Sequence, residues 1–370
     1  MPKARYVMVG GFLGAGKTTA IVKLAEHLRG RGLRAGLITN DQSVDLVDTA
    51  RVRAAGFAVE EITGGCFCCK FNSLVEASQR LTRETTPEVL IAEPVGSCTD
   101  LQATVSYPLR QLYWDDYEVS PLSVLVDPIR CARILGLQRG KSFSEKVLYI
   151  YRKQMEEAEC LVINKVDLLE APARAALVKE VQRQFPRAQV FEVSCKTGDG
   201  LAEEGGWFDA VLGGALGDEA AMGVDYDVYA EGEALLGWLN ATSEVRAGAA
   251  FDGNAFLIDI AKRVRHGLAQ IGVEIAHLKM TLLPDEGPDL GAVSLTATEG
   301  EPVATHSLQD LLRRGELAVN LRAEGDPEVL ERVVRQALAA LATVQVIPGE
   351  IHAFRPGRPE PTHRMRGVRG

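Results

Sequence analysis

Short apolar runs alternate with amphipathic stretches through the first half of the chain. The runs are predicted to be strands at residues 6–9, 35–39, 89–92, 123–126, 160–163 and 189–193. A helix is predicted from Thr18 to Arg29, directly after the first run. Continuous apolar runs of this length, separated by helices, are typical of a mainly parallel sheet buried on both faces. The pattern therefore predicts an α/β fold with a doubly wound, mainly parallel sheet.

The second half has a different pattern. Strands are predicted at residues 238–245, 275–283, 292–298, 317–322 and 343–347. One amphipathic helix carries Leu257, Ile260 and Val264 on its apolar face, and a second carries Leu330 and Val334. This order is two βαβ-like halves with an added hairpin strand, which predicts a smaller α+β domain of the ferredoxin-like type.

Four segments follow from these patterns. Residues 213–223 are rich in Gly, Ala and acidic residues, which indicates a linker or a domain edge. Residues 353–370 hold five arginines and three prolines with little apolar content, as in disordered segments. The predicted segments are a first domain at 1–215, a linker at 216–224, a second domain at 225–350 and a basic, disordered tail at 351–370.

Composition narrows the classes of partner. The net charge is −9 and the acidic residues are spread along the chain, so no basic stripe for a nucleic acid is formed. No apolar run approaches the roughly 18–20 residues that span a bilayer, and no signal-peptide pattern precedes the first strand. Seven cysteines, an odd number, suit a reducing compartment. We expect a cytoplasmic protein without nucleic-acid or membrane partners.

A complete phosphate-binding loop, Gly11-Phe12-Leu13-Gly14-Ala15-Gly16-Lys17-Thr18, joins the first predicted strand to the first predicted helix. Gly11, Gly14 and Gly16 allow backbone N–H groups, including that of Ala15, to close around phosphate oxygens at the helix N-terminus. Lys17 is predicted to reach the β- and γ-phosphates. The hydroxyl of Thr18 is a predicted Mg²⁺ ligand, and Thr19 is predicted to bind the α-phosphate.

Two later motifs specify the base. Asn164-Lys165-Val166-Asp167 follows an apolar strand, and the Asp167 carboxylate would accept two hydrogen bonds from guanine, which adenine does not offer. After the next strand, Ser194-Cys195-Lys196 matches the second guanine-contacting loop of GTPases. Together these motifs predict GTP, and a P-loop ATPase or small-metabolite kinase is the alternative.

Three cysteines are crowded into Gly64-Gly65-Cys66-Phe67-Cys68-Cys69. Their spacing lets one turn direct three sulfur atoms at one ion, and thiolates favour Zn²⁺, Co²⁺ or a similar ion over Mg²⁺. Three ligands leave a tetrahedral position open for a client. Thiols without metal, buried or redox-active, are the alternative. Cys98, Cys131, Cys160 and Cys195 are interpreted as ordinary buried residues.

Four motifs in order along the chain resemble those of the CobW-type metallochaperone GTPases. They are the phosphate-binding loop, the cysteine segment, Glu93-Pro94-Val95-Gly96 and Asn164-Lys165-Val166-Asp167. These GTPases are relatives of the nickel-insertion GTPases that serve hydrogenase and urease. The resemblance covers roughly residues 5–212. It implies that Glu93 takes the place of the usual Walker B aspartate near Mg²⁺ and the attacking water, with Asp41 beside it. It also implies a slow, switch-like GTPase that forms a homodimer when GTP is bound.

The combined prediction is a GTPase that couples hydrolysis to delivery of a transition metal, or of a metal cofactor, to a client metalloenzyme. The switch segment after residue 40 and the C-terminal half depart from the common CobW pattern, so the client stays open. A regulatory GTPase, whose cysteines sense redox state or zinc and which acts through partner binding, is the alternative function.

Overall fold

The chain folds into two compact units in the computed structural model, which describes residues 3–40, 55–217, 220–287, 289–341 and 344–367. Unit 1 consists of Met1–Ala230 together with Pro359–Gly370, and unit 2 is Glu231–Arg358. The chain thus leaves unit 1 once and returns to it at the end. Among the described residues, no helix is both long enough and apolar enough to cross a bilayer.

Unit 1 is built on an eight-stranded sheet with the order β3-β2-β4-β1-β6-β7-β8, and β5 pairs with β1 beside it. Each of these pairings is parallel. The strands are β1 (Ala4–Gly11), β2 (Ala35–Asn40), β3 (Ala58–Ile62), β4 (Val89–Glu93), β5 (Tyr117–Val119), β6 (Ser123–Val126), β7 (Cys160–Ile163) and β8 (Gln189–Glu192). The predicted α/β fold is confirmed.

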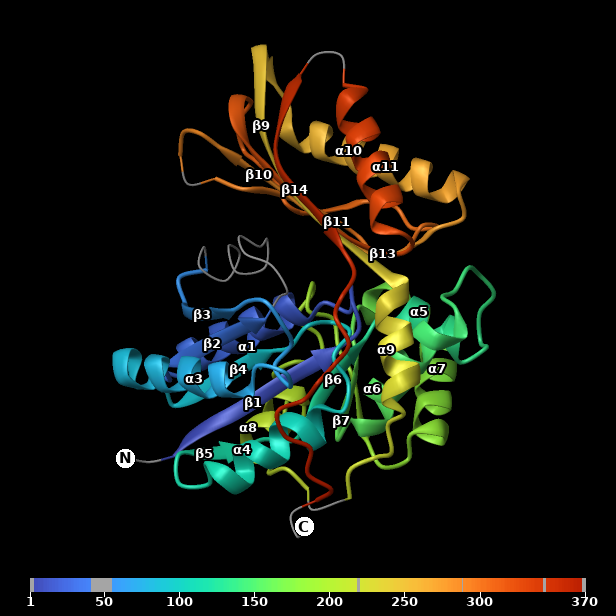
Figure 1. Cartoon of the computed structure of the whole chain (residues 1–370). Helices are drawn as coiled ribbons and strands as arrows, with labels where there is room; N and C mark the ends of the chain where they lie inside the picture. Colours follow the sequence, from blue (N-terminus) through green and yellow to red (C-terminus); the bar gives the residue numbers. More distant parts are fainter. Residues whose placement is uncertain (1–2, 41–54, 218–219, 288, 342–343, 368–370) are drawn as a thin grey trace. The chain divides into compact units, whose positions relative to one another are not determined.

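Helices connect these strands and cover the sheet (Figure 1). They are α1 (Lys17–Gly30), α3 (Phe71–Thr85), the π-helix η1 (Gln102–Ser106), α4 (Tyr107–Leu112), α5 (Pro128–Ile134), α6 (Glu145–Glu157), the 3₁₀ helix η2 (Val166–Leu168), α7 (Ala171–Gln184) and α8 (Trp207–Gly213). A further helix, α9 (Tyr226–Leu235), begins in unit 1 and ends in unit 2. One hydrophobic core joins the apolar face of α1, at Ile21 and Leu24, to the central strands and to Trp207 of α8. This packing holds the N-terminus of α1 at the end of β1.

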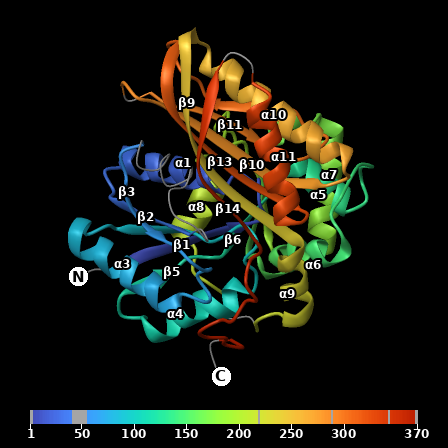
Figure 2. The same cartoon turned by 45° about the horizontal axis from the view of Figure 1, so that its top comes forward.

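Unit 2 is a six-stranded antiparallel sheet with the order β12-β11-β10-β13-β9-β14. Its elements are β9 (Leu236–Phe251), α10 (Gly253–Gln270), β10 (Glu274–Pro284), β11 (Gly291–Leu295), β12 (Val303–His306), β13 (Leu312–Glu324), α11 (Pro327–Ala339) and β14 (Gln345–Phe354). Figure 2 shows α10 and α11 side by side on this sheet. The order β10-β13-β9-β14 is that of the predicted ferredoxin-like sandwich, which β11 and β12 extend.

The segment boundaries differ from those predicted. The expected linker begins with Leu216 and Gly217, which pack in unit 1, where the backbone carbonyls of both accept hydrogen bonds from Arg110. The described part of the expected tail is not disordered. Ile351–Phe354 belong to β14, and residues 359–367 belong to unit 1. Composition could not reveal this, since the backbone partners of these residues lie far away in the sequence.

Candidate nucleotide and metal site

The phosphate-binding loop lies where β1 ends at Gly11 and α1 begins at Lys17. Gly11, Gly14 and Gly16 have φ angles of 127°, 80° and 96°, in the region that favours glycine. A Cβ on Gly11 would lie 2.3 Å from the Leu125 carbonyl oxygen. The loop is therefore shaped by a backbone that other residues would not allow.

Thr18 and Glu93 meet behind this loop. The Thr18 hydroxyl donates to Glu93 Oε1 at 3.0 Å, and both side chains are buried, as is that of Lys17. Thr19 is half-buried in the first turn of α1. Glu93 is the last residue of β4, and it pairs in register with Thr39 of β2. Asp41, predicted to lie beside Glu93, is outside the described residues.

The strand β4 continues into a loop that touches the phosphate loop. A Cβ on Gly96 would lie 2.8 Å from Leu13 Cδ2 and 3.1 Å from the Leu13 backbone nitrogen. Gln154 of α6 donates to the carbonyl oxygens of Gly96 and Cys98 at 3.0 and 2.8 Å. The Glu93–Gly96 motif is thus packed directly against the loop, and only glycine fits at its last position.

Asn164 joins three loops through one side chain. Its amide nitrogen donates to the Ala15 carbonyl at 2.9 Å. Its amide oxygen accepts from the backbone N–H of Lys165 at 2.8 Å and from that of Cys195 at 3.1 Å. Asn164 is buried, so these bonds satisfy an amide that has no access to water. The two predicted base-recognition loops are therefore tied to the phosphate loop.

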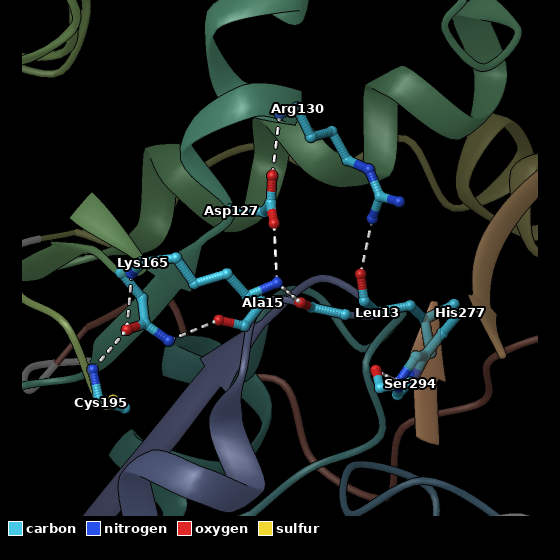
Figure 3. A network of polar contacts seen from close by, with 10 residues as sticks. Leu13, Ala15, Asp127, Arg130, Lys165, Cys195, His277 and Ser294 are labelled. Atoms are coloured by element: carbon cyan, nitrogen blue, oxygen red, sulfur yellow. Dashed lines mark hydrogen bonds and ion pairs between the residues drawn. The ribbon is translucent and has the colours of Figure 1, made fainter. Parts of the chain in front are cut away.

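Lys165 extends across the same site (Figure 3). Its Nζ donates to the Gly14 carbonyl at 2.8 Å and forms an ion pair with Asp127 at 2.8 Å. Burial raises the pKa of the Asp127 carboxyl, but Lys165 and Arg130 outweigh burial, and the pKa lies below its ordinary value. Arg130 also donates to the Leu13 carbonyl at 2.6 Å.

Asp127 and Arg130 are not among the site residues predicted from the sequence. A signal was present, because Asp127-Pro128 directly follows the strand at residues 123–126 and is the pattern of a helix N-cap. The Asp127 carboxylate indeed accepts from the Arg130 backbone N–H at the start of α5. Its second oxygen faces the nucleotide loop through Lys165.

The predicted guanine loops stand next to each other. Asp167 is exposed, and its carboxylate accepts from the Ser194 hydroxyl at 2.6 Å. The same hydroxyl oxygen accepts from the Thr197 backbone N–H at 3.2 Å, which holds the second loop in place. Cys195 is buried and Lys196 is exposed. The Asp167 carboxylate is thereby oriented while remaining open to solvent.

The three cysteines form a compact cluster, as the spacing predicts. Cys66 Sγ lies 2.8 Å from Cys68 Sγ and 3.2 Å from Cys69 Sγ, and the other pair is 3.8 Å apart. A turn in which Cys69 and Lys70 donate to the Cys66 carbonyl leads into α3. Helix N-termini stabilise thiolates. This group is the candidate metal site found among the described residues.

The thiols do not ionise alike. Hydrogen bonds with Cys68, Cys69 and Cys98 lower the pKa of Cys66 well below its ordinary value, against the effect of burial. The hydrogen bond to Cys66 raises the pKa of both Cys68 and Cys69. Cys66 is therefore the first thiolate of the cluster. Cys98 is buried, as interpreted above, and it is also a neighbour of the cluster.

The end of β2 connects this cluster to the nucleotide loop. The buried amide of Asn40 donates to the carbonyls of Ile62 and Gly65, at 2.9 and 2.7 Å. Gly65 directly precedes Cys66, and the neighbouring Thr39 pairs with Glu93. A glycine loop, a buried Thr18–Glu93 pair and an Asn-Lys-x-Asp loop on one parallel sheet define the class of P-loop proteins of the GTPase type.

Comparison with known families agrees with this class. Residues 5–192, just over half of the chain, match the family described as CobW/HypB/UreG, nucleotide-binding domain. The chain belongs to this family, and the resemblance to CobW-type metallochaperone GTPases is confirmed.

Curated relatives match about half of the chain. The zinc chaperone CobW of Sinorhizobium sp is 25% identical over 211 residues, covering 52% of this chain and 59% of that protein. The zinc chaperone YeiR of Escherichia coli is 28% identical over 171 residues, with 46% and 49% covered. The chain thus spans about half the length of these relatives. The solved structure of the hydrogenase maturation factor HypB from Archaeoglobus fulgidus has 23% identity and a TM-score of 0.41, covering 57% of this chain and 89% of that one.

The close approach of Gly96 to Leu13 generates a stability prediction. Gly96→Ala should lower the free energy of unfolding by about 1–3 kcal/mol, because the new methyl group must displace the phosphate loop. Gly30→Ala is the matched control, since a Cβ there meets no atom within 4 Å. Urea unfolding of the two variants measures the difference. Equal stabilities would contradict the packing described for the Glu93–Gly96 loop.

Proposed function

We propose that the protein is a GTP-hydrolysing metallochaperone, which couples GTP binding and hydrolysis to delivery of a transition metal or metal cofactor to a client enzyme. The observation that carries the proposal is the short connection between the two sites. Thr18 contacts Glu93, Glu93 pairs with Thr39, and the next residue, Asn40, binds the backbone beside Cys66. The zinc chaperones among the relatives support the choice of zinc, with Co²⁺ or a similar ion as a substitute.

GTP would be held by the phosphate loop. The backbone N–H groups of Gly11–Gly16 would surround the phosphates, and Lys17 would place its charge on the β- and γ-phosphates. The Thr18 hydroxyl and the Glu93 carboxylate offer adjacent oxygen atoms, which are the ligands that Mg²⁺ prefers. Glu93 would also lie near the attacking water. Thr19 would bind the α-phosphate, and Asp41 is proposed to act beside Glu93.

Guanine would be recognised by Asp167. Its carboxylate is already oriented by Ser194, so little rearrangement is needed before it accepts two hydrogen bonds from the base. Lys165, Cys195 and Lys196 would complete the base pocket. The Asn164 amide keeps these loops at a constant distance from the phosphate loop.

The metal cargo would bind to Cys66, Cys68 and Cys69. Their sulfur atoms are within 4.8 Å of one another, and soft thiolates suit Zn²⁺. Three sulfur ligands leave one tetrahedral position for an incoming ligand of the client, so transfer can begin before the ion leaves.

Hydrolysis would act as the switch. Loss of the γ-phosphate removes a ligand from the Thr18–Glu93 region, and the loop from Glu93 leads directly to Cys98, a neighbour of the cluster. Metal affinity would therefore depend on the bound nucleotide. The family resemblance further suggests a homodimer in the GTP state.

GTP should bind with Mg²⁺ far more tightly than ATP, and Asp167→Asn should weaken GTP binding by roughly 10- to 100-fold, because a charged acceptor is lost. Asp199→Asn, an equal change in charge at an exposed loop position, is the control. Fluorescence titration with labelled nucleotides measures both. Equal affinity of the wild-type protein for GTP and ATP would refute the assignment of the base.

Lys17→Ala should reduce GTP hydrolysis by at least about 100-fold, because a preorganised charge on the transferred phosphoryl group disappears. Lys23→Ala changes the same residue type on the same helix, where Lys23 pairs with Glu26 at the surface, and should leave the rate unchanged. Phosphate release measures the two rates. Hydrolysis by Lys17→Ala at the wild-type rate would place the active lysine elsewhere.

The reduced protein should bind about one Co²⁺ per chain, with a thiolate-to-metal charge-transfer band in the near ultraviolet. Serine at positions 66, 68 and 69 together should remove the band while GTP binding stays intact, whereas Cys131→Ser should keep it. Apparent affinity should fall as the pH drops below neutral, because ligation displaces thiol protons. A wild-type protein without the band would favour the redox-sensing regulatory GTPase.

A further inference from the structure

The end of the described chain lies across the cysteine cluster. The backbone N–H of Glu360 donates to Cys69 Sγ at 3.2 Å. The Thr362 backbone N–H donates to the Cys68 carbonyl at 2.9 Å, and the Thr362 hydroxyl donates to the Cys69 carbonyl at 3.2 Å. Three hydrogen bonds thus connect residues 359–367, hereafter the strap, to two of the three cysteines. Figure 1 shows this last segment, in red, on unit 1.

An arginine fixes the strap to a buried carboxylate. Arg364 forms an ion pair with Asp100 at 2.7 Å, and Asp100 is only 1% exposed. Asp100 also accepts from the Tyr226 hydroxyl at 2.7 Å. It has a φ of 65°, which is rare for a residue other than glycine. Buried Glu157 lies near enough for its pKa to be raised by burial and then by Asp100.

This environment favours a cation beside the ionised carboxylate. Burial raises the pKa of Asp100 above its ordinary value, although the hydrogen bonds from Tyr226 and Arg364 act in the opposite direction. Two buried carboxyl groups close together repel when ionised, and removing the partner of a buried charge is strongly destabilising. Arg364 brings a positive charge to this buried carboxylate, and a segment that replaced the strap would stabilise Asp100 in the same way with a cation.

The strap also supplies a backbone hydrogen bond that a helix beneath it cannot make for itself. In the π-helix Gln102–Ser106, the backbone N–H of Tyr107 bonds to the Gln102 carbonyl, five residues earlier. The next bond of this pattern would join residue 108 to the Ala103 carbonyl, but Pro108 has no N–H. Met365 of the strap supplies the donor, at 2.8 Å. The surface beneath the strap thus presents a carbonyl acceptor that the strap satisfies.

The polar contacts of the strap depend on few of its side chains. Apart from Arg364 and the Thr362 hydroxyl, its hydrogen bonds to the cysteines and to Ala103 come from the backbone, while Pro359 is buried and the ring of His363 lies against Phe71. Another extended segment with an arginine or lysine could make the same bonds. The surface beneath the strap includes Cys69, which is the least buried cysteine of the cluster.

We propose that the strap closes the face of the cysteine cluster from which metal is transferred, and that the client segment which displaces it is extended and carries an arginine or lysine for Asp100. This inference rests on the proposed function for its second part. The first part concerns only access to Cys69. The strap is thus a segment of the protein that occupies the client's place until the client arrives.

The first experiment measures alkylation of Cys69 by iodoacetamide in the reduced, metal-free full-length protein, with peptide mass spectrometry as the readout. Arg364→Ala should raise the rate at Cys69 about tenfold, because the strap opens more often. Arg364→Lys should raise it less. Arg366→Ala removes the same charge from an exposed side chain of the same segment and should leave the rate unchanged.

Equal rates for Arg364→Ala and Arg366→Ala would overturn the closure. Neither metal nor nucleotide is present, so this result is separate from failure of the metallochaperone function, which the cobalt titration reveals. Thermal unfolding of each variant verifies that the fold is intact.

A second experiment tests the chemistry of the partner. A synthetic peptide with the sequence of residues 359–367 is added to the Arg364→Ala protein and should slow alkylation of Cys69. The same peptide with Arg364→Glu should not. Equal protection by both peptides would overturn the requirement for a cation, and protection by neither would overturn the claim that this face accepts a separate segment.

Discussion

Parallel pairing of β1, β2, β4, β6 and β7 is the constraint on which the rest of unit 1 depends. Because these strands run in the same direction, their carboxyl ends lie at one edge of the sheet. That edge collects the phosphate loop after β1, Asn40 at the end of β2, Glu93 at the end of β4, Asp127 after β6 and Asn164 after β7. No single residue there forms a site, and the register of the strands brings them together.

Polar side chains then join these loops to one another through hydrogen bonds. Asn164 ties the base loops to the phosphate loop, and Asn40 ties the end of β2 to the cysteine turn. Both amides are buried, so losing a partner would leave a polar group without compensation. These hydrogen bonds are costly to leave unmade, so each amide favours one arrangement of the segments that it joins.

Much of this arrangement could be predicted from local patterns. Strands with continuous apolar runs, such as residues 123–126 and 160–163, were predicted with their exact bounds because they are buried on both faces. Strand β3 was missed because Ala58–Ile62 includes Glu60 and Glu61 and is mostly half-buried. Motifs placed the phosphate loop, the Asn164 loop and the cysteine cluster. The roles of Asp127, Arg130 and Cys98 depend on contacts between segments far apart in sequence, which local patterns do not contain.

Unit 2 is an insertion within unit 1, since the chain returns to unit 1 only at Pro359. The bond from Glu360 to Cys69 spans 291 residues, among the most distant pairings in the chain. During synthesis the thiols and the whole nucleotide fold emerge before the segment that covers them. A newly made chain therefore passes through a stage with an open cysteine cluster, and closure of such a long loop comes late in folding. The order of translation therefore leaves the three thiols uncovered in the growing chain until residues 359–367 have been made.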